Sequence, residues 1–363
     1  MADNVEINTY QPPQVGTAQV QLLERLCNAC GVSGDEHEVR QIVLEEVRPH
    51  TENIRIDALG NVLVTREGSE PDRLRVMLAA HMDETGFMLT SDEEDGLFRF
   101  ETVGGVDVRL LPGKPVWVGR SHTPGVIGAK PIHLVSSDEG KNTFSLDSLR
   151  LDLGPGNSAK AKIGDRAVFA TLFTRLGGSL RARALDDRLG VATLIELVKN
   201  PPGNIDLLAV FTVQEEVGTR GASVASYSLD PDLAFVLDCT PAYDLPSWDN
   251  SENSQYNTRL GAGPAIYIAD KHTLSDLRLV RHIMATAEAL DIPYQIRQPG
   301  GSGTDAGAIH KQRTGIPAVS VSVPGRYLHS PASLCRLSDW EHTLTLMHAV
   351  LTRLTPQVLA TER

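Results

Sequence analysis

Residues 210–222 read VFTVQEEVGTRGA, in which two adjacent glutamates, Glu215 and Glu216, follow an apolar run. That run, Leu207 to Val213, has the length and the β-branched residues of a buried strand in a parallel sheet. In an open α/β sheet, ligand chemistry concentrates beyond the carboxyl ends of such strands. Neighbouring carboxylates repel each other, so the pair predicts a bound cation or a shared proton. A lone pair would more often be a solvated turn, and the rest of the chain decides between these readings.

Three more apolar strands lead into residues that can bind metals. VMLAAHMDETGFM contains a strand that ends at His81, with Asp83 two residues later. Alternating strand faces point both side chains the same way, so the Asp83 carboxylate can accept the imidazole N–H. LAFVLDCTPAYD predicts a strand that ends at Asp238, and AVSVSVPGRYLHSPAS predicts one that leads to His329. Together with the glutamate pair, these strand ends predict a metal site.

An aspartate pair precedes a predicted helix in RARALDDRLGVATLIELV. Asp186 and Asp187 lie immediately before the amphipathic pattern of Leu189 to Val198. Aspartate is a common N-cap residue, so helix capping and metal binding are both open roles for this pair.

The potential ligands are His81, Asp186, Glu216, Asp238 and His329. Five ligands are too many for one four-coordinate zinc ion that keeps an open position. They suit two ions that share a bridging carboxylate. Nitrogen and oxygen donors without cysteine favour a hydrolytic site with zinc or cobalt, or with manganese, over a structural zinc site.

Many short motifs, spread from Leu22 to Pro331, resemble one family in their order and spacing. They include GVSGDEHEVR, HMDETGFM, VGGVDVRLLPG, GVIGAKPIHL, ALDDRLG, QEEVGTRGA, GTDAGAIH and PGRYLHSP. The chain resembles the tetrahedral aminopeptidases, which are self-compartmentalising dinuclear metallo-aminopeptidases that also carry the names deblocking and glutamyl aminopeptidase. The resemblance implies that His81 and Asp238 bind one ion, that Glu216 and His329 bind the other, and that Asp186 bridges them.

The resemblance also implies roles for residues beside the ligands. Glu215 matches the general base of the family, and Asp83 matches the residue that orients the first histidine. Asp187 receives no metal role. Two stretches depart from the pattern of many relatives. Many read DVTHAGD where this chain has DCTPAYD, with Cys239 after the ligand and no His nearby, and many carry a Glu shortly after RYLHSP, where this chain has Ser333. Both differences concern the substrate pocket and the surroundings of the site and leave the ligands in place.

The expected fold class is α/β, a mixed-sheet α/β/α metallopeptidase domain with an inserted small β-barrel (PDZ-like) domain. Short alternating segments between HMDETGFM and ALDDRLG, punctuated by Gly and Pro about every 8–12 residues, predict the barrel. We expect a flexible tail at 1–16, the catalytic domain at 17–85 and 174–363, and the inserted domain at 86–173. Helical patterns flank the insertion at Val20 to Cys30, Glu36 to Val47, Leu189 to Lys199, Leu274 to Leu290 and Asp339 to Leu354. The resemblance implies that dimers form through the inserted domain and assemble into a dodecamer.

Charge and composition limit the kinds of partner and the cellular location that we expect for this chain. A net charge of -12 disfavours nucleic acid and anionic membranes as partners and suits a cytoplasmic enzyme. The resemblance, and not the charge, implies peptide substrates. No window approaches a transmembrane helix, and the first residues lack a signal-peptide pattern. Cys27 and Cys30 form a CxxC pair inside a helical pattern without a second pair, which favours ordinary helix packing.

Three other functions are open. An amidohydrolase that removes N-acyl groups would use similar metal chemistry. A glycan hydrolase could use paired carboxylates, but it has no use for two strand-end histidines, and only 5% of the residues are aromatic. A catalytically inactive assembly scaffold would be marked by loss of Glu215 or of a ligand, and all are present.

Overall fold

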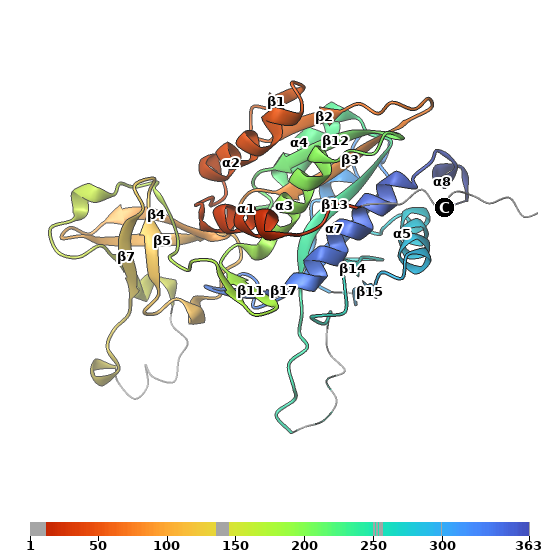
Figure 1. The fold of residues 1–363 in the computed structure, drawn as a ribbon. Helices are drawn as coiled ribbons and strands as arrows, with labels where there is room; N and C mark the ends of the chain where they lie inside the picture. Colours follow the sequence, from red (N-terminus) through yellow and green to blue (C-terminus); the bar gives the residue numbers. More distant parts are fainter. Residues whose placement is uncertain are drawn as a thin grey trace, which may run out of the picture.

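The computed structural model describes residues 12–135, 145–249, 251, 253, 257–298 and 300–362. They form a mixed sheet covered by helices, with a closed barrel beside it (Figure 1). Most of the predicted tail, residues 1–11, lies outside the described residues, and residues 12–16 lead into the first helix without regular structure.

The large sheet has 11 strands and a parallel centre. Nine strands follow one another across it in the order β1 (Ile54–Ile56), β2 (Val62–Arg66), β12 (Ile205–Thr212), β3 (Leu74–His81), β13 (Leu233–Pro241), β16 (Ala318–Arg326), β17 (Ser333–Arg336), β11 (Ser179–Ala182) and β10 (Thr174–Leu176). β14 (Ala265–Ile266) pairs with β16 and with β15 (Gln295–Ile296). β12, β3, β13 and β16 are parallel neighbours, buried on both faces, which explains their unbroken apolar sequences.

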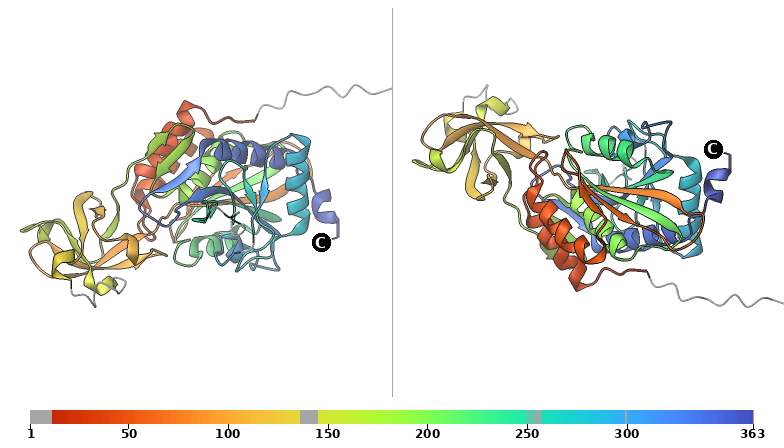
Figure 2. Two further views of the ribbon diagram at one scale, coloured as in Figure 1. Left: turned by 90° about the horizontal axis from the view of Figure 1, so that it is seen from below. Right: turned by 90° about the horizontal axis from the view of Figure 1, so that it is seen from above.

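Helices cover both faces of this sheet (Figure 2). The larger apolar core joins one face to α1 (Thr17–Asn28), α2 (His37–Val47), α3 (Leu185–Lys199), α5 (Leu277–Ala289) and α7 (Leu337–Thr352). A smaller core joins the other face to α4 (Arg220–Leu229) and α6 (Ala306–Ile309). A short helix, α8 (Gln357–Ala360), lies near the C-terminal end. The predicted α/β fold with a mixed sheet is confirmed.

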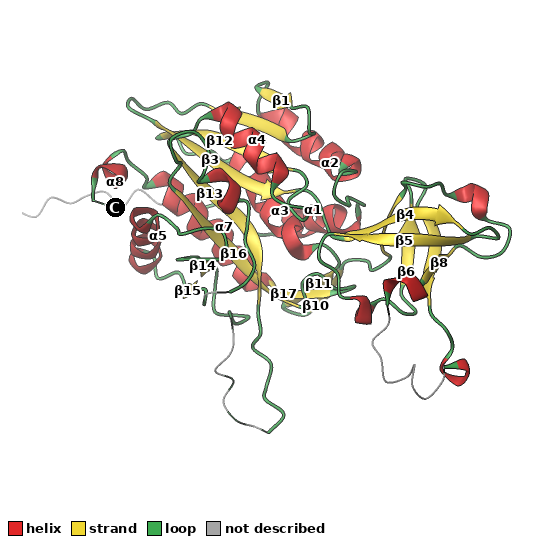
Figure 3. Cartoon of the chain, turned by 180° about the vertical axis from the view of Figure 1, so that it is seen from behind, coloured by secondary structure: helices red, strands yellow, loops and turns green. Residues whose placement is uncertain are grey.

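Six strands form the closed barrel in the order β4 (Gly86–Asp92), β5 (Leu97–Val103), β8 (Arg150–Asp152), β7 (Thr123–Gly128), β6 (Pro115–Val118) and β9 (Arg166–Phe169). The barrel has its own core, in which Phe87 makes edge-to-face contacts with Phe100 and Phe169. Figure 3 shows these strands set apart from the large sheet. Single 3-10 turns are η1 (Arg48–His50), η2 (Val108–Leu110), η3 (Ile132–Leu134), η5 (Leu146–Ser148) and η6 (Ser158–Lys160). The predicted small barrel is present, and its PDZ-like character stays a prediction.

Some element ends differ from the sequence-based expectation. β13 continues to Pro241 instead of ending at Asp238, because its pairing with β16 extends to the Pro241–Gly325 pair. α1 ends at Asn28, so Cys30 lies outside the helix that the sequence pattern predicts through it. The buried Arg183 side chain binds the carbonyl oxygens of Asn28 and Ala29, which closes that helix end. In the described part of the chain, no helix is long and apolar enough to cross a membrane.

Candidate metal centre

The predicted ligands converge at one end of the parallel strands. His81 is the last residue of β3, and the parallel register places it beside Thr212, the last residue of β12. Glu215 and Glu216 lie in the loop that follows β12. Asp238 lies within β13 and Asp186 at the start of α3, while His329 lies three residues beyond the end of β16. The fold therefore brings residues that are up to 248 positions apart (329 − 81) to one place.

The Asp186 carboxylate lies between the two histidines. Its Oδ1 is 3.2 Å from His81 Nε2, and its Oδ2 is 3.5 Å from His329 Nε2. Asp238 Oδ1 is 3.7 Å from His81 Nε2, and Glu216 Oε1 is 3.4 Å from His329 Nε2. The five side chains thus form two groups that share Asp186. Their assignment as metal ligands stays a prediction.

Asp187 has a different role from its neighbour. Its Oδ2 accepts the backbone N–H of His81 at 3.1 Å, and its Oδ1 accepts that of Gly190 at 2.9 Å. A Cβ at Gly190 would lie 2.3 Å from that oxygen, so this position requires glycine. Asp187 therefore accepts a backbone N–H group near the start of α3 and holds the backbone of His81 in place. The Asp186 side chain instead faces the two histidines. Of the two roles that the sequence left open for the pair, helix capping falls to Asp187, and metal binding by Asp186 stays a prediction.

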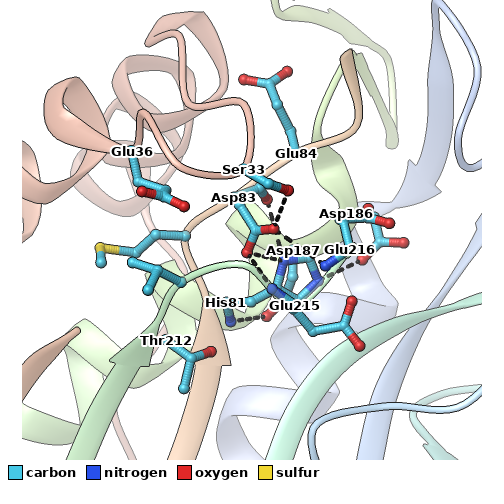
Figure 4. A network of polar contacts seen from close by, with 12 residues as sticks. Ser33, Glu36, His81, Asp83, Glu84, Asp186, Asp187, Thr212, Glu215 and Glu216 are labelled. Atoms are coloured by element: carbon cyan, nitrogen blue, oxygen red, sulfur yellow. Dashed lines mark hydrogen bonds and ion pairs between the residues drawn. The ribbon is translucent and has the colours of Figure 1, made fainter. Parts of the chain in front are cut away.

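Asp83 connects His81 to the glutamate loop (Figure 4). Its carboxylate accepts the backbone N–H groups of Glu215 at 2.9 Å and Glu216 at 3.1 Å, and the Ser33 hydroxyl at 2.6 Å. The nearest acceptor for His81 Nδ1 is the Asp83 backbone carbonyl at 3.1 Å, whereas the carboxylate is 3.5 Å away. The carboxylate expected only to orient His81 therefore mainly positions the loop that carries Glu215. Sequence reasoning assigned no role to Ser33, although GVSGDEHEVR contains it.

Burial dominates the electrostatics of the acidic residues. Burial raises the pKa of Glu215 well above its ordinary value. His81 lowers this pKa in part, whereas the neighbouring carboxylates of Asp305 and Asp238 raise it further. Burial likewise raises the pKa of Glu216 to about 8 and that of Asp238 to about 6. Each of these groups is therefore costly to ionise without a nearby cation.

The pKa values of both histidines are raised, although burial alone would lower them. Burial alone would lower the pKa of His329, but Asp186 and Glu216 raise it to about 10. His81 behaves alike, since Asp186, Asp238 and Asp83 together outweigh its burial and raise its pKa. Burial would raise the pKa of Asp186, yet the two histidines hold it well below its usual range. Carboxyl groups outnumber imidazoles among these side chains.

The donor set fits divalent cations. Among the described residues, no Lys or Arg nitrogen lies within 4.0 Å of the carboxylates of Asp186, Asp238 or Glu216, whereas the nearby Glu84 pairs with two arginines. Buried carboxylates need a compensating positive charge, and imidazole with carboxylate is the donor set of hydrolytic zinc and its relatives.

Three further residues border the centre. Asp305, from the GTDAGAIH motif, is 1% exposed and accepts the Thr212 hydroxyl at 2.6 Å, while its Oδ1 has no partner in the described structure. Cys239 donates its thiol to the Leu185 carbonyl at 3.2 Å, and Ser333 donates its hydroxyl to the Tyr327 carbonyl at 3.2 Å. The two departures from the family pattern therefore make backbone contacts and leave the ligand positions intact.

A loop of the barrel segment also contacts the centre. Gly105, in the loop after β5, offers its carbonyl oxygen 2.9 Å from His329 Nδ1. This loop and the segment after β16 line a hollow beside His329, to which Val106, Leu110, Tyr327 and Leu328 contribute. No predicted ligand lies in the barrel segment, but the contact fixes the ring of one. The barrel segment is therefore not independent of the site.

A mixed α/β sheet with imidazole and carboxylate groups gathered at the ends of its parallel strands is typical of metal-dependent hydrolases. The model of the M42 glutamyl aminopeptidase family matches residues 60–346. The chain belongs to this family, and it is an exopeptidase hydrolase.

Similarity to known proteins extends over nearly the whole chain. A putative aminopeptidase from Acetivibrio thermocellus is 33% identical over 331 residues, which are 90% of this chain and 96% of that protein. The structure of aminopeptidase APDkam598 from the archaeon Desulfurococcus kamchatkensis matches with a TM-score of 0.88 at 33% identity, covering 94% of this chain and 96% of that one. The TET1 peptidase of Pyrococcus horikoshii, which can assemble into a tetrahedron or a large octahedral shell, matches with a TM-score of 0.81 at 33% identity, covering 93% and 100%.

Proposed function

We propose that this chain is a dinuclear metal-dependent aminopeptidase that removes N-terminal residues from peptides. One observation carries the proposal: the Asp186 carboxylate directs one oxygen to each of two histidines. His81 and Asp238 would hold one ion, Glu216 and His329 the other, and Asp186 would bridge them. Zinc or cobalt, or manganese, suits these donors.

The chain's own residues supply the proton transfers. When bound, two divalent ions lower the pKa of a shared water and polarise the scissile carbonyl. Glu215 would accept the proton of that water and deliver it to the leaving amine, for which a raised pKa is favourable. Asp83 would keep Glu215 in place through its two backbone hydrogen bonds to the loop.

A substrate panel tests the proposed reaction. We expect the chelator-treated chain, after addition of cobalt or zinc, to hydrolyse aminoacyl-anilides, with glutamyl and lysyl anilides included to probe the preferred residue. An N-acyl amino acid and a β-glucan, offered in parallel, should stay intact. Turnover of the acyl amino acid alone would favour the amidohydrolase, and metal-independent cleavage of the glucan would contradict the proposal.

Metal removal should make stability depend on pH. In the metal-free protein, the folded-state pKa values of Glu216 (about 8) and His329 (about 10) lie above the ordinary values of 4.5 and 6.5. The folded state then binds more protons than the unfolded state between about pH 6.5 and 8, so stability falls as pH rises through this window. Asp186 acts in the opposite sense but only at acidic pH. We expect the Tm of the chelated protein to be lower at pH 8 than at pH 6.5.

The metal-loaded protein is the matched comparison. Ions displace the protons of carboxylates and imidazoles, so loading should raise the Tm more at pH 8 than at pH 6.5. Differential scanning fluorimetry of both forms at the two pH values provides the measurement. A Tm increase on loading that is the same at both pH values would contradict a cluster that needs cations to relieve its charge.

We further propose that the chain forms homo-oligomers, with the segment 86–173 as a PDZ-like dimerisation domain and 17–85 with 174–363 as the catalytic domain. Exposed apolar side chains on the barrel segment support this proposal. Ile132 is 81% exposed, Leu134 is 61% exposed and Ile163 is 62% exposed. Such side chains commonly mark protein interfaces. A dodecamer assembled from six dimers would give the shell-like compartment that the resemblance implies.

Charged substitutions test the interface. We expect Ile132→Asp combined with Leu134→Asp to give species of lower mass by multi-angle light scattering, because burying two carboxylates at a contact is unfavourable. Val224→Asp, at an exposed apolar position on α4, is the control and should keep the parent mass. A wild-type chain that is monomeric across micromolar concentrations would end the oligomer proposal but not the aminopeptidase one.

A further inference from the structure

Cys30, Glu38 and His122 bring a thiol, a carboxylate and an imidazole together away from the active centre. Cys30 follows α1, Glu38 lies in the first turn of α2, and His122 lies in the turn between β6 and β7. One ligand atom from each residue lies within 4.8 Å of the other two. The cluster therefore joins a turn of the barrel to the first two helices of the rest of the molecule.

The three side chains are held in position by several contacts. His122 Nε2 is 2.7 Å from Glu38 Oε1, and Glu38 Oε2 accepts the backbone N–H of Cys30 at 2.9 Å. The imidazole of His122 stacks on the Trp117 ring, with 5.5 Å between ring centroids. His122 also has a φ of 49°, a left-handed conformation that is uncommon for a residue other than glycine. The ring nitrogen is thus directed at the carboxylate before any ligand binds.

An ion pair alone does not account for this arrangement. The side chains of His122 and Glu38 are 37% and 30% exposed, and a pair so accessible to water contributes at most about 1 kcal/mol. Such a pair has no need of a thiol. Arg183 Nη2 lies 3.6 Å from Cys30 Sγ, and the carboxylate of Glu84, 3.0 Å from that guanidinium, offsets part of its positive charge. Burial raises the pKa of the Cys30 thiol to about 12, and Arg183 opposes this shift only in part, so the thiolate needs a bound cation to form.

We propose that Cys30, Glu38 and His122 bind one zinc-like divalent ion, with water as the fourth ligand. Zinc takes sulfur, nitrogen and oxygen donors, and two donors on a tetrahedral ion are roughly 3.5 Å apart, so a small closure completes the site. Binding forms a sulfur–metal bond and releases the thiol proton to water. A thiolate ligand disfavours magnesium and calcium. The site does not depend on the proposed aminopeptidase mechanism.

Cobalt provides the probe, because a cobalt ion bound to thiolate has a charge-transfer absorption that nitrogen and oxygen ligands do not give. The full-length chain is stripped with chelator and titrated with Co²⁺. We expect the band in the wild type and in Cys27→Ser, which removes a fully buried thiol of the same CxxC pair. Cys30→Ser should abolish the band. His122→Asn, which suits the left-handed turn, should weaken it strongly.

Zinc content gives a second measurement. After zinc loading and dialysis, Cys30→Ser and His122→Asn should each hold one equivalent per subunit less than the wild type and Cys27→Ser. Hydrolysis of an aminoacyl-anilide, followed in parallel, should remain in all four proteins and reports on the active centre separately. Absence of the band in the wild type, or equal zinc content in all four proteins, would overturn the proposal. A band that survives in Cys30→Ser would place the ion on another thiol, such as Cys239, and would also overturn it.

Discussion

Glu215→Gln should lower the turnover of an aminoacyl-anilide by a factor on the order of 10²–10⁴ while both metal ions remain bound. The amide keeps the shape of the side chain but cannot accept the proton of an attacking water. The Asp83 contacts to the loop use backbone N–H groups, so the substitution leaves them in place. Metal analysis and steady-state kinetics on the same preparation provide the measurement.

Glu70→Gln is the matched control, because Glu70 is an exposed glutamate that precedes β3, whereas His81 lies at the other end of that strand. It should keep the wild-type rate and metal content. Two results would count against a general base at Glu215: a turnover close to that of the wild type, or a loss of metal that by itself explains the loss of rate.

The strand ends of the candidate metal centre could be predicted from the sequence because local patterns carry that information. Unbroken apolar runs identify the parallel strands, and polar residues directly after them must lie at the same sheet edge. This reasoning places His81, Glu215 and Glu216 where the structure has them. It misplaces the end of β13, because the additional pairs beyond Asp238 depend on the partner strand and not on the local pattern.

Contacts made across the fold could not be predicted in this way. The Asp83 carboxylate binds two backbone N–H groups 132 and 133 residues away, and no spacing rule indicates such a pairing. The contact between the Gly105 carbonyl and His329 cannot be predicted from the sequence either, because every residue carries a backbone oxygen. Cys30 illustrates the same limit: a CxxC pattern suggests a partner at Cys27, whereas the neighbours in space are Glu38 and His122.

Asp186→Ala should release both ions of the active centre and reduce activity to background. Asp186 has one oxygen near each histidine, so its removal takes a donor from both groups of ligands. His81→Ala takes a donor from one group only, because Glu216 and His329 keep their contact with each other. Metal analysis after dialysis should therefore find neither active-centre ion in the first variant and one of them retained in the second.

The comparison between these two variants distinguishes a bridge from an ordinary ligand. Both substitutions remove a polar group that is largely shielded from water, so circular dichroism and light scattering must first show the same folded, assembled state. With the fold intact, a difference in metal content reports on coordination. If both variants lose the same single ion, Asp186 serves only one metal. A true bridge also couples the ions, so in the wild type the binding of one ion should change the affinity for the other.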